Sequence, residues 1–301
     1  MMQGKVIKSI GADYHVCEPT GQVYVCKLRG RLRLLAAKLT KPVVVGDEVL
    51  FGVASGQATG AIHKVLPRTN YLLRRSTHKR AYGQLIAANL DQALLVINAV
   101  HWAAAPTLID QFLVMTEAFE VCPGVVYNKL DLLDTAQREA LNAQRQLYQS
   151  LGYMTLAISA LKGTYMDQLR QCLQGKVSSL TGHSGVGKSF IINTLAPTLQ
   201  QAVAPPTRMA QRGQHTTTHT SLLPIAPHTF VIDTPGVQEL MPYNLDKALI
   251  GHYFPEIRRL MADCKFHNCT HQHEPACAVL QALAQGYIAR SRYDSYLRMQ
   301  V

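Results

Sequence analysis

The sequence has few aromatic residues, few charged residues and no long apolar run. Of its 301 residues, 7% are aromatic and 16% are charged, and only one is Trp. Residues 1–15 contain no apolar core, so we expect no secretory signal peptide. The longest apolar stretch, residues 93–105, is interrupted by Asn98 and His101, and it is shorter than the roughly 20 residues that cross a bilayer. We therefore expect a cytoplasmic protein without a membrane partner.

Acidic residues are scarce at the start of the chain. Residues 1–80 contain 14 Lys and Arg but only 4 Asp and Glu, which accounts for +10 of the formal net charge of +11. Residues 81–301 are nearly neutral, with 16 basic and 15 acidic residues. Charge of one sign concentrated in this way repels itself unless a polyanion lies against it. This favours a polyanion-binding module over a solvated basic face.

The seven cysteines lack the spacing of a disulfide framework, and we expect no disulfides. Four of them are scattered among apolar neighbours, where a free thiol usually packs as a small hydrophobic group. These four are Cys17, Cys26, Cys122 and Cys172. The other three lie close together, with histidines between them, in residues 264–277.

Four segments of different pattern follow one another. Residues 1–67 contain about five short β-type runs separated by Gly, Pro and Asp, which predicts an all-β barrel, and the basic charge suits an OB-fold that binds RNA. Residues 68–84 form a basic linker. Apolar runs alternate with helical patterns over residues 85–241, which predicts an α/β domain with a doubly wound, mostly parallel sheet. Residues 242–301 are mostly helical around a Cys/His cluster.

The segment GHSGVGKS fits the pattern G-x-x-x-x-G-K-[ST] of phosphate-binding loops. It follows a predicted strand and opens a predicted helix, so its amides and the helix N-terminus would face the α- and β-phosphates of a nucleotide. Lys188 would bridge the β- and γ-phosphates, and the Ser189 hydroxyl would bind Mg²⁺. This context disfavours a simple glycine-rich turn. The residues that we expect around the phosphates are Gly182, His183, Ser184, Gly185, Val186, Gly187, Lys188 and Ser189.

The segment NKLD ends a predicted buried strand, where ligands of α/β sheets bind. Asp131 can accept hydrogen bonds from both the N1–H and the amino group of guanine, whereas adenine offers no matching pair. Asn128 would tether the loop and the edge of the base, and the stem of Lys129 would cover the ring. Ser159 and Ala160 end the next predicted strand, where a backbone N–H can meet guanine O6. These residues predict a site for GTP and disfavour an ATPase.

Two further motifs follow the phosphate-binding loop. DTPG closes the last predicted strand, where Asp233 would hold Mg²⁺ through water and the Gly236 amide would sense the γ-phosphate. RGQHTTT lies before that strand and offers hydroxyls for a loop that orders on the γ-phosphate. We favour Thr217 as the residue that senses Mg²⁺, with Thr216 and Thr218 as close alternatives.

The order of these motifs differs from that of ordinary GTPases, which run from the phosphate-binding loop through the threonine loop and D-x-x-G to N-K-x-D and S-A. Here N-K-x-D and S-A come first, and the other three follow in their usual order. Joining the old ends and cutting the chain after D-x-x-G leaves the same sheet and site, and closely spaced termini permit such a change. We therefore expect a circularly permuted P-loop GTPase domain.

A cluster of cysteines and histidines lies in the predicted helical region, in CKFHNCTHQHEPAC. Three thiolates and one imidazole form a closed tetrahedral set that suits a structural zinc ion. The ligands that we expect are Cys264, Cys269, His271 and Cys277. His267 and His273 compete with His271 for the fourth position. Three reduced thiols in a helical cap are the alternative to a metal site.

The motif order, with GHSGVGKS, RGQHTTT, DTPGV and the C-terminal cysteines, resembles the ribosome-small-subunit-dependent GTPases of bacteria, the RsgA/YjeQ family. The resemblance covers nearly the whole chain and implies an OB domain, a permuted GTPase domain and a zinc domain. It implies a late assembly factor that binds the small ribosomal subunit and hydrolyses GTP faster when bound. The same cysteine spacing in the family supports the zinc site.

The residue that orients the attacking water has two candidates. Many GTPases place Gln directly after D-x-x-G, but here that position is Val237, which cannot orient water. The resemblance offers His215 as the substitute, because an imidazole can hold a water molecule. If His215 contacts only rRNA or solvent, Gln238 is the other candidate.

We therefore expect a monomeric three-domain GTPase that uses GTP and Mg²⁺, holds one structural Zn²⁺, and acts on the small ribosomal subunit and its rRNA. The barrel would bind rRNA, the central domain would hydrolyse GTP, and the zinc domain would dock and relay. The runner-up is an RNA-binding scaffold whose GTP site is a switch with negligible hydrolysis. The complete set of phosphate-binding groups argues against the scaffold, and Val237 keeps it open.

Overall fold

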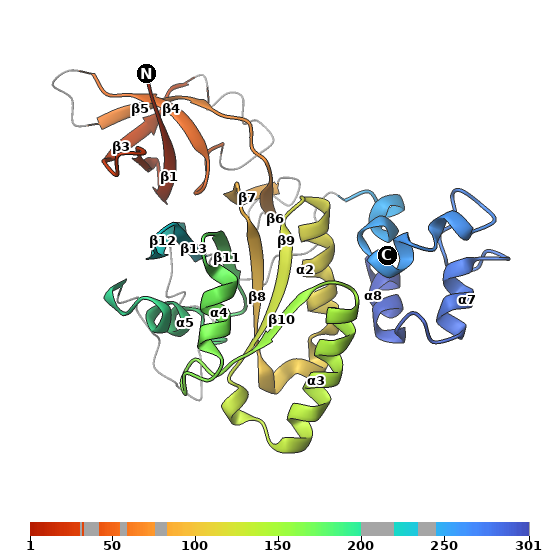
Figure 1. Ribbon diagram of the computed structural model, residues 1–301. Coiled ribbons are helices and arrows are strands. Elements are labelled where there is room, and N and C mark those ends of the chain that lie inside the picture. Colours follow the sequence, from red (N-terminus) through yellow and green to blue (C-terminus); the bar gives the residue numbers. More distant parts are fainter. Residues whose placement is uncertain are drawn as a thin grey trace.

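The computed structural model describes residues 1–30, 32, 42–54, 59–75, 83–199, 220–233 and 245–300. Figure 1 shows three parts: a barrel of strands near the N-terminus at the top, a central sheet flanked by helices below it, and beside that a helical part that carries the C-terminus. The fold class expected from the sequence, an all-β barrel followed by an α/β domain and a mostly helical part, is confirmed.

The N-terminal barrel is built from β1 (Met2–Ile10), β2 (Asp13–Cys17), β3 (Val23–Leu28), β4 (Glu48–Gly52) and β5 (Thr59–Val65). The sheet closes on itself because β1 pairs with both β2 and β4, and because β3 pairs in parallel with β5. This is the five-stranded barrel of an OB-fold. Side chains alternate between the inside and the outside of each strand, and Val6, Val16 and Phe51 are fully buried in the barrel core.

A hairpin of β6 (Tyr71–Arg75) and β7 (Gly83–Ala88) follows the barrel, where the sequence pattern indicates a basic linker. The chain enters this hairpin past Arg68, whose guanidinium donates to both carboxylate oxygens of Asp47 at 2.7 and 2.9 Å. Asp47 is buried, and the paired guanidinium offsets the free-energy cost of burying its carboxylate. The exit of the chain from the barrel is therefore held by a charged pair.

The central sheet is built from β8 (Gln92–Asn98), β9 (Cys122–Asn128), β10 (Met154–Ala157), β11 (Val177–Thr181), β12 (Thr220–Ala226) and β13 (Thr229–Asp233). Their order is β10-β9-β8-β11-β13-β12, and every neighbouring pair is parallel except β12 with β13. The carboxyl ends of the five parallel strands therefore lie at one edge of the sheet, which is where ligands of such sheets bind.

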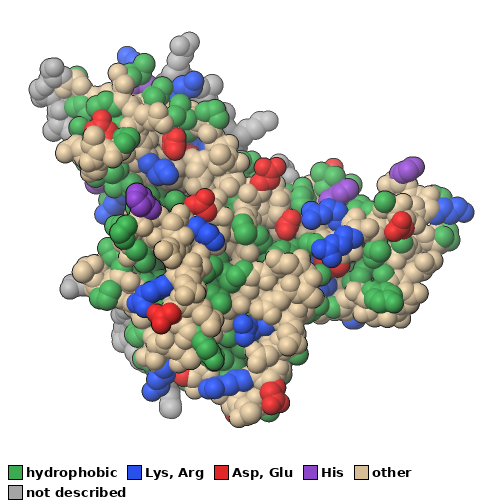
Figure 2. Space-filling view, viewed as in Figure 1, with side chains coloured by type: hydrophobic (Ala, Val, Ile, Leu, Met, Phe, Trp, Pro, Cys, Tyr) green, Lys and Arg blue, Asp and Glu red, His purple; other side chains and the backbone are tan. Residues whose placement is uncertain are grey.

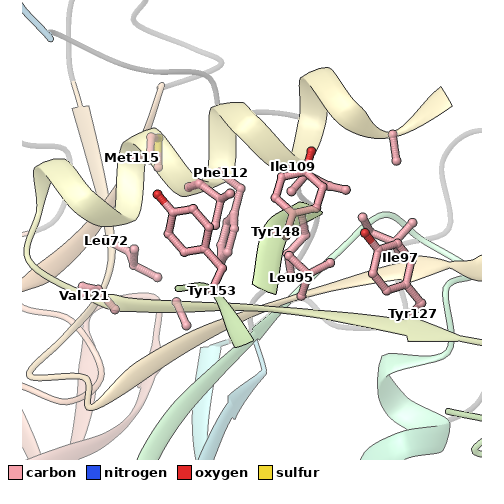
Figure 3. Packing of buried hydrophobic residues seen from close by; sticks show 14 of the residues in the cluster. Leu72, Leu95, Ile97, Ile109, Phe112, Met115, Val121, Tyr127, Tyr148 and Tyr153 are labelled. Atoms are coloured by element: carbon pink, nitrogen blue, oxygen red, sulfur yellow. The ribbon is translucent and has the colours of Figure 1, made fainter. Parts of the chain in front are cut away.

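Helices cover both faces of this sheet. They are α2 (Pro106–Ala118) and α3 (Thr135–Ser150) on one face, and α4 (Met166–Leu173) and α5 (Lys188–Leu195) on the other. Short 3₁₀ turns lie at η1 (Ala99–Ala104), η2 (Leu130–Leu132) and η3 (Pro197–Leu199). In Figure 3, Ile109 and Phe112 of α2 lie on the side of the helix that faces Leu95 and Ile97 of β8. Strand β8 is an apolar run because both of its faces are covered.

Helix α2 is apolar on nearly all sides, in contrast to the amphipathic pattern of a surface helix. Ile109, Phe112 and Met115 lie in the core of the central sheet. Val114 lies instead in the core of the C-terminal part, beside Phe254. One helix is thus shared between two hydrophobic cores.

The barrel and the central sheet are joined by backbone pairing as well as by the chain. Ser9 of β1 lies opposite Thr220 of β12, and Lys8 lies opposite Ser221, in an antiparallel pair. Strand β1 therefore extends the central sheet into one of 11 strands that includes the whole barrel.

The C-terminal part consists of η4 (Lys247–Tyr253), α6 (Pro255–Arg258), η5 (Met261–Asp263), α7 (Ala278–Ala284) and α8 (Arg290–Gln300). Ile250, Phe254, Tyr293 and Tyr296 form much of its core. Among the helices of the described residues, none has the length and apolar character needed to cross a membrane.

Candidate nucleotide site and metal centre

The phosphate-binding loop connects the end of β11 to the first residue of α5. Gly185 and Gly187 have φ angles of +82° and +99°, in the left-handed region that glycine adopts without strain. A Cβ at Gly187 would lie 2.5 Å from Nδ2 of Asn128, and a Cβ at Gly182 would lie 2.3 Å from the Val96 carbonyl oxygen. These glycines are required both by the turn and by the close approach of neighbouring backbone.

Lys188 lies across the loop that precedes it. Its Nζ donates to the carbonyl oxygens of Gly182 at 2.6 Å and His183 at 3.1 Å. Burial lowers the pKa of Lys188, and the nearby carboxylate of Asp233 acts in the opposite direction. The pKa of His183 is lowered by burial and then by the charge of Lys188. An anion in the loop would stabilise the ammonium group of Lys188, which suits a phosphate.

Asn128 joins three loops that are far apart in the sequence. Its Nδ2 donates to the Val186 carbonyl at 2.9 Å, and its Oδ1 accepts from the Ala160 amide at 3.1 Å. The side chain is buried, so both hydrogen bonds are shielded from water. The NKLD segment, the loop at Ser159 and Ala160, and the phosphate-binding loop therefore meet at one point.

Asp131 is oriented by its neighbours in this arrangement. Its carboxylate accepts a hydrogen bond from the Ser159 hydroxyl, and that hydroxyl accepts in turn from the Lys162 amide. Lys129 adopts a left-handed φ of +70°, which turns the chain between Asn128 and Asp131. The sequence predicted only a backbone contact at Ser159, and its hydroxyl as a partner of Asp131 was missed.

Asp233 ends β13 at the same edge of the sheet. It lies opposite Leu180 in the parallel pairing of β11 with β13, directly before the phosphate-binding loop, and it is buried. The remaining predicted residues of the site lie outside the described residues. These are His215, Thr216, Thr217, Thr218, Gly236, Val237 and Gln238.

A cavity of about 340 Å³ lies beside the phosphate-binding loop. One wall is formed by residues 183–186, and the other by the end of β8, by η1 and by Ala105 and Leu108 around the start of α2. The polar side chains that line this cavity are those of Asn98, His101, His183 and Ser184. No motif in the sequence pointed to this cavity, because its walls come from segments more than 70 residues apart.

The four predicted metal ligands come together in the C-terminal part. Their ligand atoms all lie within 4.8 Å of one another, and the residues are Cys264, Cys269, His271 and Cys277. Nδ1 of His271 lies 3.6 Å from Sγ of Cys264 and 3.5 Å from Sγ of Cys277, and the two sulfur atoms are 3.9 Å apart. Sulfur atoms around a tetrahedral zinc ion are about 3.8 Å apart, so the set fits zinc.

His271 is the histidine that belongs to the cluster. His267 and His273 are both exposed and are not among its members. Burial raises the pKa of Cys269 to about 12, and burial also raises the pKa of Cys277. A cation is what would favour the thiolates in such surroundings.

Side chains outside the four ligands hold this loop in place, and the sequence pattern had not singled them out. Glu274 accepts from the amide and hydroxyl of Thr270 at 2.6 Å each, and from the amides of Gln272 and His273 at 3.0 and 3.1 Å. Burial raises the pKa of Glu274, but these donors outweigh it and hold the pKa well below its usual value. The Tyr293 hydroxyl donates to the His271 carbonyl at 2.6 Å.

Comparison with known families finds two matches along the chain. The family model described as RsgA N-terminal domain matches residues 3–62, and the model described as RsgA GTPase matches residues 65–242. Curated relatives match over nearly their full length. The protein named small ribosomal subunit biogenesis GTPase RsgA of Bacteroides fragilis (strain YCH46) is 40% identical over 298 residues, which cover 99% of this chain and 96% of that protein.

The protein of the same name from Cytophaga hutchinsonii is 40% identical over 296 residues, which cover 98% of this chain and 96% of that protein. Among solved structures, YjeQ from Thermotoga maritima superimposes with a TM-score of 0.77 at 32% identity, covering 99% of this chain and 97% of that one. YloQ, described as a circularly permuted GTPase, superimposes with a TM-score of 0.73 at 28% identity, covering 100% and 94%.

The fit of Gly187 against Asn128 generates a first prediction. We expect Gly187→Ala to weaken binding of guanine nucleotides by at least about tenfold, because the added Cβ must displace the side chain that holds the three loops together. Binding of a fluorescent GDP analogue measures this. Gly175→Ala is the matched control, since Gly175 also has a positive φ, of +71°, but a Cβ there meets open space. Equal losses in both variants would show that backbone strain alone is responsible.

Glu274 generates a second prediction. We expect Glu274→Ala to release zinc to a chromogenic chelator about tenfold faster than the parent, because four donors of the loop between Cys269 and Cys277 lose their common acceptor. Asp263→Ala removes the same charge directly beside Cys264 and should release zinc at the parental rate. Parental kinetics in Glu274→Ala would mean that the loop keeps its shape without this carboxylate.

Proposed function

The chain belongs to the RsgA GTPase family, and from that premise we propose that it hydrolyses GTP while bound to the small ribosomal subunit and assists the late maturation of that subunit. The observation that carries this proposal is the meeting of three loops at Asn128, which supports one common site for the predicted base-binding and phosphate-binding residues. The names of the full-length relatives support the choice of partner.

Guanine would bind between the NKLD segment and the loop at Ser159. The Asp131 carboxylate would accept from the N1–H and the amino group of the base, with the Ser159 hydroxyl holding the carboxylate in position. The Ala160 amide donates to Asn128 at 3.1 Å, which supports a place for that loop beside the base edge. The stem of Lys129 would cover the ring. A bound adenine would leave Asp131 without its two donors, and this mismatch supports GTP as the substrate.

The phosphates would lie on the amides of residues 182–189, with the ammonium group of Lys188 moving from the carbonyls of Gly182 and His183 to the β- and γ-phosphates. Ser189 and Asp233 offer a hydroxyl and a carboxylate, which suit Mg²⁺ as a hard cation, and Thr217 would add a second hydroxyl. When bound, Mg²⁺ neutralises charge on the β- and γ-phosphate oxygens. The Gly236 amide would sense the γ-phosphate.

His215 would hold the attacking water, because Val237 occupies the position where many GTPases place Gln. In the C-terminal part, Cys264, Cys269, His271 and Cys277 would bind one zinc ion that supplies folding stability and no chemistry of hydrolysis. The basic barrel would supply much of the salt-dependent affinity for rRNA, since residues 1–80 carry most of the net charge.

Nucleotide selectivity tests the guanine site. We expect Asp131→Asn to weaken GTP binding by at least about tenfold and to improve binding of xanthosine triphosphate, because the amide can donate to the second oxygen of xanthine. Asp134→Asn is the control, since Asp134 lies three residues away and only caps α3. Equal affinity of the parent for GTP and ATP would remove the basis for this assignment.

Turnover on the small subunit tests the function as a whole. We expect small ribosomal subunits to stimulate GTP hydrolysis by the parent. In His215→Ala we expect the stimulated rate to fall by about 100-fold, while the affinities for GTP and for subunits stay at the parental values. His228→Ala is the control, because His228 lies in the turn between β12 and β13. If His215→Ala turns over at the parental rate on saturating subunits, Gln238 becomes the candidate.

A further inference from the structure

Helix α2 spans the distance between the phosphate-binding loop and the C-terminal part. Leu108 in its first turn, with Ala105 before it, forms one wall of the cavity whose opposite wall is residues 183–186. Val114, in the second half of the helix, is fully buried in the core of the C-terminal part. A single packed helix therefore reaches from the cavity beside the loop to the core of the C-terminal part, and close-packed interiors transmit strain.

Three arginines of the C-terminal part contact polar side chains of α2, at its first turn, its middle and its last turn. The pairs are Arg298 with Thr107 at 2.8 Å, Arg292 with Asp110 at 2.6 Å, and Arg258 with Glu117 at 3.7 Å. Figure 2 shows Lys and Arg side chains gathered on the surface where the C-terminal part meets the central part. The contacts thus run along the helix instead of meeting it at one point.

The middle pair fixes the two parts together. Arg292 is 1% exposed and donates to Glu256 at 2.6 and 3.2 Å as well as to Asp110, and its guanidinium lies 4.5 Å from the centre of the Phe254 ring. Asp110 also accepts from the Tyr148 hydroxyl at 2.9 Å. Burial alone would lower the pKa of Arg292, but the two carboxylates outweigh it and raise the pKa. Removing one member would leave buried charge without a partner and would disturb folding.

The pair at the first turn is different, because Arg298 is exposed and Thr107 is half-buried. Thr107 directly precedes Leu108 of the cavity wall, and Arg298 lies in the last turn of α8. A change at either residue can therefore loosen the first turn of α2 without emptying a core. This contact is the point at which the C-terminal part holds the helix nearest to the phosphate-binding loop.

We propose that Arg298 and Thr107 are positioning residues for GTP hydrolysis: they hold the first turn of α2 beside the phosphate-binding loop and, resting on the function proposed above, transmit docking of the C-terminal part on the small subunit to the nucleotide site. For binding affinities the coupling is reciprocal: the factor by which the subunit changes the affinity for GTP is the factor by which GTP changes the affinity for the subunit. Neither side chain lines the cavity beside the phosphate-binding loop. Both act through Leu108 and the cavity wall.

Full-length variants test the transmission. We expect Arg298→Met and Thr107→Val each to reduce the stimulation factor, the ratio of kcat with saturating subunits to kcat without them, by about fivefold. Arg298→Lys should recover part of the loss, because an ammonium group can still donate to Thr107. Arg290→Met is the matched control, since exposed Arg290 lies on the same helix and contacts Asp294 and the ring of Tyr293, both within that helix. Variants that keep the parental ratio, or that lose both rates equally, overturn the transmission.

Hydrogen exchange without ribosomes tests the positioning itself. We expect the amides of residues 99–109 to exchange about fivefold faster in Arg298→Met and Thr107→Val than in the parent, and Arg290→Met to match the parent. Unchanged exchange in both variants overturns the positioning role. If the parent shows no stimulation by subunits, the proposed function fails instead, and the exchange result still decides whether this pair holds the turn.

Discussion

The two hydrogen bonds of the Asn128 side chain are the interaction on which the nucleotide site depends. They connect positions that are 58 and 32 residues away, the Val186 carbonyl and the Ala160 amide. Because the amide is buried and both ends are occupied, a shift of any one loop leaves a polar group unpaired away from water, which is costly. The absence of a side chain at Gly187 is part of the same constraint, since there is no room for a Cβ beside Nδ2 of Asn128.

This dependence on contacts in space explains why the permuted order of the motifs does not matter to the site. The loops lie at the carboxyl ends of neighbouring parallel strands, β9 with β10 and β11 with β13, and those neighbours are set by sheet pairing. Strand β8 lies between the two pairs and holds them in register. The chain beyond β13 is left to continue into the C-terminal part, whose core takes Val114 from a helix of the central sheet.

The sequence predicts the loops of the site better than it predicts the side chains that hold those loops in place. Glycines at fixed spacing and NKLD at the end of an apolar strand reflect local requirements. The predicted phosphate-binding and base-binding segments could therefore be found from the chain alone, as could the four members of the Cys3His cluster. Ser159 as a donor to Asp131 depends on how two loops approach each other, which no spacing encodes. Glu274 looks like an ordinary exposed acid in the sequence, although four donors converge on it in the fold.

Helix α2 does carry a signal in the sequence, because Asp110 lies between the apolar residues Ile109 and Phe112 and a buried carboxylate needs a partner. That partner, Arg292, is 182 residues away, and its identity could not be deduced without the fold. The hairpin of β6 and β7 was not predicted for a related reason. Its basic residues indicated a linker, although the two strands pair mainly with each other.

The pairing of β1 with β12 has a consequence for the solution behaviour of the molecule. Strand β12 would otherwise be the outer strand of the central sheet, with unpaired N–H and C=O groups along its free side. Outer strands of this kind are templates for pairing with other chains, and proteins cover them, shorten them or charge them. Here the barrel covers the start of β12 at Thr220 and Ser221. The barrel therefore also shields part of the outer edge of the central sheet, and removing it would expose that edge as well as discarding basic charge.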